Sequence, residues 1–202
     1  MRHRLWILAM VTMVSLVAAP TAVGAVATTT AKVKAADISL EYPSSWYTAP
    51  VTKKAIAAQT KLLKKTNPKL AAALAESGVD ASQFKLRAIN PEATGETVGV
   101  QLIEGQGSPG SLSDYKSAVI PGFEAVGATV LAAKTLKVSG KTAYRIDVTL
   151  PITLPDGSKQ VTRLGQLVIP EGDDTVSINV AAIDDAAGQE LVDDILGSVR
   201  RL

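Results

Sequence analysis

Four strand-like segments joined by very short connections constrain the fold more than any other feature of this sequence. The segments are residues 130–138, 142–152, 160–169 and 175–183. Turn-forming residues separate them: Ser139-Gly140, Pro155-Asp156-Gly157 and Glu171-Gly172. Parallel neighbours need a crossover of about a dozen or more residues, so connections this short predict an antiparallel meander.

The segments before the meander mix strands and helices. Alternating apolar residues predict three further strands, over residues 38–42, 85–89 and 97–104. Thr52 can cap a helix that ends at Asn67, and Pro68 can begin a second helix that stops at Gly78. These elements lie between the first strand and the meander, without regular strand-helix alternation.

Two more helices are predicted around the strands. Ser111 and Asp114 can cap a helix that reaches about Gly127, and Pro121-Gly122 should kink or break it, because proline removes a hydrogen bond inside a helix. A last helix over residues 186–201 has apolar residues at helical spacing. The sequence therefore predicts an α+β fold, in which helices cover an antiparallel sheet.

Residues 1–27 have the layout of a secretory signal peptide. A basic head is followed by an apolar run over residues 5–19 and by the small-x-small sequence Ala25-Val26-Ala27. We expect cleavage after Ala27, a flexible tail over 28–36, a single domain over 37–202, and a secreted or extracellular protein. An uncleaved membrane anchor is the alternative, because residues 6–27 carry no charge. The sequence has no cysteine, which excludes an acylated-cysteine anchor and disulfides.

Charge is unevenly distributed along the chain. Of the 21 basic side chains, Arg2 and Arg4 belong to the predicted signal peptide, which leaves 19 against 19 acids and argues against a nucleic-acid-binding protein. Residues 53–69 contain six lysines and no acid: Lys53, Lys54, Lys61, Lys64, Lys65 and Lys69. This segment is either a solvated helix face or a surface that weakly contacts an anionic membrane or polymer.

Few catalytic chemistries are open to the expected mature chain. The one histidine, His3, lies in the predicted signal peptide, so a triad, a general base near neutral pH and a zinc site are excluded. Adjacent acids point in different directions in a strand or helix, so the three pairs Asp173-Asp174, Asp184-Asp185 and Asp193-Asp194 do not each form a site. No catalytic residue, cofactor or metal is predicted.

Residues 105–110 match the glycine pattern of dinucleotide-binding loops. That pattern requires a parallel sheet, and the tight turns that follow exclude one. Pro109 also removes an amide donor from the loop. We therefore interpret the segment as a flexible loop that could form the rim of a binding site.

Two aromatic residues and a pair of charged residues complete the candidates. Trp46 is expected in the core, because large rings are scarce in this chain, while Tyr47 is expected at the edge with its hydroxyl in water. Arg145 and Asp147 lie on one face of a predicted strand. They form either a surface ion pair, worth well under about 1 kcal/mol, or Arg145 anchors a ligand.

The order of elements resembles that of the PsbP/Mog1-like family, whose fold is an α/β/α sandwich. The resemblance rests on the segments ISLEYPSSW, SLSDYKSAVIPGFEAVGA, LKVSGKTAYRIDVTLP and LVDDILGSVRRL, and it covers nearly all of residues 38–202. It is nearest to exported actinobacterial proteins, in which TNPKLAAALAESGVDASQFKLRAINP has counterparts. Pro121-Gly122 departs from the uninterrupted helix usual in the family.

Members of this fold mostly act as accessory or binding proteins, so the resemblance implies a non-enzymatic binding module with a protein or envelope component as its partner. A carrier of a small apolar or lipid-like ligand, held between sheet and helices, is the alternative. A carboxylate-dependent hydrolase is the least favoured. The candidate binding surface consists of Lys53, Lys54, Lys61, Lys64, Lys65, Arg145 and Tyr47.

Overall fold

The computed structural model describes residues 27–49, 51–66, 68–69, 71–72, 81–93, 95–154 and 156–202. The predicted signal peptide therefore lies outside the described residues, except for Ala27. Asn67 and Gly78, at which the two predicted helices end, also lie outside them. Among the helices that the structure describes, none has the length and apolar character needed to cross a membrane.

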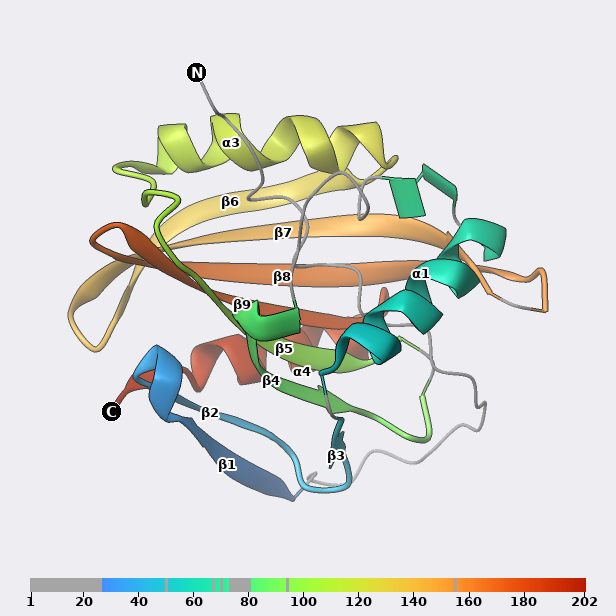
Figure 1. Ribbon diagram of the computed structural model, residues 1–202, viewed down its shortest axis with the longest axis horizontal. Helices are drawn as coiled ribbons and strands as arrows, with labels where there is room; N and C mark the ends of the chain where they lie inside the picture. The colour runs from blue at the N-terminus through green and yellow to red at the C-terminus, as the bar shows by residue number, and fades with distance from the viewer. Residues whose placement is uncertain are drawn as a thin grey trace.

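A seven-stranded antiparallel sheet is the centre of the fold, with the strand order β3-β4-β5-β9-β8-β7-β6 (Figure 1). The strands β6 to β9 each pair with the next one along the chain, which confirms the predicted meander. β5 then pairs with β9 and extends the sheet. The bounds are β3 Tyr47–Thr48, β4 Phe84–Ile89, β5 Thr97–Ile103, β6 Thr129–Val138, β7 Lys141–Thr153, β8 Lys159–Glu171 and β9 Asp174–Ile183.

A second sheet joins the two ends of the described chain. Its three strands are β1 (Thr28–Val33), β2 (Ile38–Pro43) and β10 (Arg200–Arg201), in the order β1-β2-β10. Residues 28–36, expected as a flexible tail, instead form β1 and the short 3-10 helix η1 (Lys34–Ala36). The cause is long-range: β1 pairs with β2 along its whole length, and Val33 and Ala36 are buried.

Helices that the structure describes lie on the two sides of the large sheet. They are α1 (Lys53–Thr66), α3 (Leu112–Ala125) and α4 (Ala186–Gly197). In Figure 1, α1 lies in front of the sheet and α4 lies behind it. The predicted caps are present, since Thr52 Oγ1 accepts from the Ala55 N–H at 3.1 Å and Ser111 Oγ accepts from the Asp114 N–H at 3.1 Å.

Pro121 does not break α3, so of the two predicted effects, a kink or a break, the break is absent. The helix continues from Leu112 to Ala125 with Pro121 inside it. Pro121 lies on the exposed side. Water can therefore bind the carbonyl that proline leaves without a helical donor. The buried side of α3 carries Tyr115, Val119 and Phe123, whose packing holds the helix on the sheet.

Each face of the sheet has its own hydrophobic core. The front face carries Tyr144, Ile146 and Val148 beneath α3. The back face carries Leu167, Ile178 and Val180 beneath α4 and the small sheet. Because side chains alternate along a strand, the apolar residues of β7 to β9 serve both cores. These layers confirm the predicted α+β fold, an antiparallel sheet with helices on both sides.

Candidate functional site

Five of the candidate residues are lysines of α1, and the side chains of all five are exposed. At 3.6 residues per turn, their positions fall within an arc of about 120° around the helix axis. α1 contains no acidic residue. We call this surface the lysine face; it consists of Lys53, Lys54, Lys61, Lys64 and Lys65.

Trp46 and Tyr47 follow each other in sequence but have different environments. Trp46 is 5% exposed and packs in the back core beside Tyr42, with the ring centroids 6.4 Å apart, which confirms the predicted core position. Tyr47 is 48% exposed, as expected for an edge residue. It pairs with Ile89 of β4, and cross-strand partners share a face, so Tyr47 lies on the front face.

Arg145 and Asp147 form the predicted ion pair, but the pair is buried and not on the surface. The two residues are 8% and 6% exposed on the back face. Arg145 Nη2 and Asp147 Oδ1 are 2.6 Å apart, and Asp193 of α4 accepts a further bond from Arg145. Burial alone would lower the pKa of Arg145, yet the hydrogen bonds and charges of Asp147 and then Asp193 raise it. The guanidinium is thus bound by carboxylates of the chain itself.

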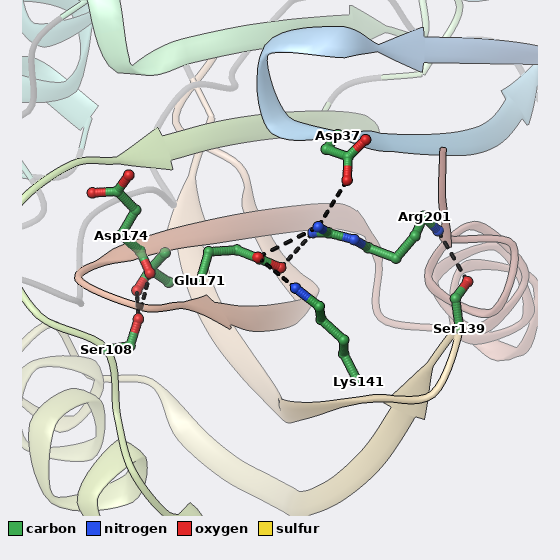
Figure 2. Close-up of polar contacts among 8 residues, drawn as sticks. Asp37, Ser108, Ser139, Lys141, Glu171, Asp174 and Arg201 are labelled. Atoms are coloured by element: carbon green, nitrogen blue, oxygen red, sulfur yellow. Dashed lines mark hydrogen bonds and ion pairs between the residues drawn. The ribbon is translucent and has the colours of Figure 1, made fainter.

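The loop over residues 105–110, expected to be flexible, is fixed to the turn between β8 and β9. Gly105 N–H donates to Asp174 Oδ1 and Gly107 N–H donates to the Asp173 carbonyl, each at 2.9 Å. Figure 2 shows the Ser108 hydroxyl bound to the backbone of Asp174. These bonds use the polar groups of the loop to hold it in place.

A network of charges lies near this loop. Arg201 binds Glu171 and Asp37, and Lys141 Nζ lies 2.8 Å from Glu171 Oε2 (Figure 2). The backbone N–H of Arg201 also donates to Ser139 Oγ at 3.0 Å. The network joins β10 to the large sheet and to Asp37, so its role is structural.

The paired acids have separate structural roles. Asp185 is the N-cap of α4, accepting from the Gly188 N–H at 2.7 Å, while Asp184 binds Arg163. Asp193 binds Arg145, whereas its neighbour Asp194 is exposed on α4. Among the described residues, no group of three or more histidine, cysteine or acidic side chains could hold a metal ion.

Sequence reasoning missed a buried polar patch on the front face, where β5, β9 and β8 meet. We call it the front polar patch; it consists of Thr97, Gln101, Gln166, Thr175, Ser177 and Asn179, all buried. The polar alternation Thr175, Ser177, Asn179 in β9 was its available signal. No neighbouring residue in the sequence indicates that this side of the strand is covered.

Hydrogen bonds connect part of the front polar patch to α3. The Tyr115 hydroxyl donates to Gln166 Oε1 at 2.7 Å, and Gln166 Nε2 donates to Asn179 Oδ1 at 3.0 Å. Asn179 Nδ2 in turn donates to Ser177 Oγ at 3.1 Å. Within the described part of the chain, Gln101 Oε1 and Thr97 Oγ1 are buried and have no hydrogen-bond partner.

Comparison with known proteins supports the fold. No protein-family model and no curated protein matches the sequence. The solution structure of cyanobacterial PsbP from Synechocystis sp. PCC 6803 matches with a TM-score of 0.54 and 12% identity, over 91% of this chain and 98% of that chain. The Ran-binding protein Mog1p of Saccharomyces cerevisiae matches with a TM-score of 0.49 and 14% identity, over 88% of this chain and 96% of that chain. The match to cyanobacterial PsbP, together with the antiparallel sheet and its helices, confirms the predicted PsbP/Mog1-like fold.

Proposed function

We propose that the chain is an exported, non-enzymatic binding or accessory protein that attaches to an anionic component of the cell envelope through the lysine face. The observation that supports this most is the set of five exposed lysines on one side of α1, with no acid in the helix. A basic helix next to an anionic surface gains about 1 kcal/mol per lysine at low salt. Five such charges give useful, salt-sensitive affinity without a deep pocket.

The non-enzymatic part of the proposal is supported by the roles of the acids. Asp185 caps a helix, Asp184 binds Arg163 and Asp147 binds Arg145. Each of these carboxylates therefore contributes to the fold itself. A hydrolase would require two carboxylates that converge on one open site.

The proposal also covers the export of the protein and its relation to other proteins of this fold. We propose that the chain is related to exported actinobacterial proteins with this fold, is cleaved after Ala27 and is released to the envelope or the medium. N-terminal sequencing of the secreted product should begin at Thr28. A product that begins at Met1 and stays with the membrane fraction would show that the protein is anchored to the membrane and is not released.

Cross-linking and pull-down from the native envelope tests the lysine face. The full-length protein is compared with a variant in which its five lysines are changed to glutamine. A matched control changes five exposed lysines elsewhere, which removes the same charge from other surfaces: Lys32, Lys34, Lys116, Lys134 and Lys159. We expect the first variant to lose its partner and the control to keep it. Identical partners for all three proteins would refute attachment through α1.

A carrier function is the second candidate, because the front polar patch lies buried between sheet and helices. Its lining favours a polar ligand over the apolar or lipid-like one expected from the sequence. Polar atoms buried against an apolar ligand would lose their hydrogen bonds to water without replacement.

A further inference from the structure

The lysine face has no counter-charge within the described part of the chain. Its five side chains are exposed, and none of the ion pairs among the described residues includes any of them. Lys61 and Lys65 are four residues apart on one helix, a spacing at which like charges repel. An anionic partner outside the chain would relieve this repulsion.

The lysine face consists of two rows that run along α1. Lys53 and Lys64 form one row, within about 20° of each other around the helix axis. Lys54, Lys61 and Lys65 form a second row, centred about 90° further round. The rows together extend over about 18 Å of the axis. Such an array has width as well as length, so an extended surface can contact both rows, whereas a linear polymer follows one row at a time.

The residue types in this arc favour attraction by charge over insertion. Ala57 is the one other residue of α1 within the arc, and it is exposed. The arc therefore presents no large apolar side chain that could enter hydrocarbon. Lysine is a hydrated point charge on a flexible stem and, unlike arginine, does not demand one bidentate geometry. These properties fit anionic headgroups that move within a surface.

Tyr47 adds an aromatic side chain on the same side of the molecule. It is 48% exposed on the front face, and α1 also lies in front of the sheet (Figure 1). β3 ends at Thr48 and α1 begins at Lys53, so the connecting chain spans at most about 18 Å. Tyrosine is enriched at membrane–water interfaces, where its ring and its hydroxyl both find suitable surroundings.

The opposite side of the protein carries the opposite charge. α4 lies behind the sheet, contains no basic residue and exposes Glu190, Asp193 and Asp194 (Figure 1). α3 is closer to neutral, with two acidic residues and one lysine. An anionic surface therefore attracts the α1 side of the protein and repels the α4 side.

We propose that the lysine face and Tyr47 bind the surface of a bilayer containing anionic lipids, in one orientation, with α1 toward the headgroups and α4 toward the solvent. This inference rests on the proposed function, because it names the anionic component to which the lysine face attaches. Binding is peripheral, and salt reverses it.

Vesicle flotation tests the partner with the protein that begins at Thr28, which keeps every described helix and strand. Phosphatidylcholine vesicles with and without phosphatidylglycerol are compared, and soluble polyphosphate at the same phosphate concentration offers the charge without a surface. We expect binding to the anionic vesicles at about 10 mM salt and its loss at about 1 M, because the Debye length falls from about 30 Å to about 3 Å.

Substitutions assign this binding to the lysine face. Changing its five lysines to glutamine should weaken vesicle binding at least about tenfold. The matched control of the pull-down, with five lysines changed elsewhere, should weaken it by about threefold or less, because those charges lie further from the surface. Tyr47→Ala should weaken vesicle binding without changing its salt dependence.

Single cysteine labels test the orientation, because the chain contains no cysteine. Ala57→Cys places a fluorophore in the lysine face, and Ala187→Cys places it on the exposed side of α4. Lipids with a spin-labelled headgroup should quench the first fluorophore and leave the second unchanged.

Four outcomes overturn the inference. Equal binding to vesicles without phosphatidylglycerol would show that charge does not hold the protein. Equal quenching at Ala57→Cys and Ala187→Cys would contradict a single orientation. Binding to polyphosphate but not to vesicles would identify a soluble polyanion as the partner and leave attachment through the lysine face intact. Binding to neither, together with unchanged partners in the pull-down, would refute the proposed attachment as well.

Discussion

The buried pair of Arg145 and Asp147 shows, at the scale of single residues, how environment sets the value of an interaction. Strand alternation predicted that the two side chains are neighbours, and they are. The sequence pattern did not predict their burial, because the helix that covers them supplies Asp193, 48 positions further along the chain. An exposed pair would contribute little, whereas breaking a buried pair leaves an unpaired charge in the interior.

Asp147→Ala should lower the free energy of unfolding by about 3–5 kcal/mol, because Arg145 stays buried without the buried carboxylate that accepts from both its Nε and its Nη2. Asp193→Ala is the comparison: its side chain is 49% exposed, so water can replace it and we expect a loss of about 1 kcal/mol. Urea denaturation of both variants measures the difference. Equal losses of stability would show that Arg145, Asp147 and Asp193 behave as an exposed network of charges.

Tyr115 provides a pH-dependent test of the polar front face. Burial, and then the charge of Asp147, raise the pKa of its phenol well above 10.0. In the unfolded chain the phenol ionises near its ordinary value, so the unfolded state binds fewer protons above pH of about 10. The contribution of Tyr115 is therefore complete below that pH and is lost as pH rises toward the folded pKa.

Tyr115→Phe should cost about 1–2 kcal/mol at neutral pH, because Gln166 Oε1 loses its 2.7 Å hydrogen bond. The variant should also lose less stability than the wild type when pH rises above about 10. Urea unfolding at a series of pH values measures both effects. Parallel pH profiles for the two proteins would contradict the raised pKa.

At the scale of elements, the local sequence pattern predicted most of the strands, but it did not predict the strands that form by pairing with a distant part of the chain. The meander follows from alternation and turn residues, for instance Ser139 and Gly140, whose positive φ angles of 47° and 86° suit a tight hairpin. The last helix, expected to reach Arg201, ends at Gly197 because Arg200 and Arg201 pair with β2. Pairing between the two ends of a chain leaves no local trace in either segment.

The β10 strand should depend on Arg201 more than on Arg200. Arg201 is bound to both Glu171 and Asp37, whereas Arg200 donates to the carbonyls of Gly197 and Val199. Arg201→Leu should therefore cost about 1 kcal/mol, since its partners are partly exposed, and should speed amide hydrogen exchange in β1 and β2. Arg200→Leu removes the same charge and should leave exchange in these strands nearly unchanged. Faster exchange in the Arg200→Leu variant alone would show that β10 is held by Arg200 and not by Arg201.

At the scale of the whole molecule, two glycines on opposite faces of the sheet differ in the described atoms that a larger side chain would meet. On the back face α4 lies so close that a Cβ built at Gly165 would be 2.6 Å from Val192 Cγ1 and 2.7 Å from Leu196 Cδ1. On the front face, the described residues leave the position above Gly99 open to within 4.0 Å. Gly165 therefore leaves no room for a larger side chain, whereas no described side chain lies within 4 Å of a Cβ built at Gly99.

The same substitution on the two faces tests this asymmetry. Gly165→Ala forces Val192 or Leu196 out of place and should destabilise the protein by about 1–3 kcal/mol. Gly99→Ala meets no such contact among the described residues and reduces the freedom of the unfolded chain, so it should be neutral or stabilise by up to about 1 kcal/mol. Both variants lie in central strands of one sheet, so urea denaturation compares them directly. A loss at Gly99 as large as that at Gly165 would mean that the space above Gly99 is filled, and the front face would then be packed as tightly as the back.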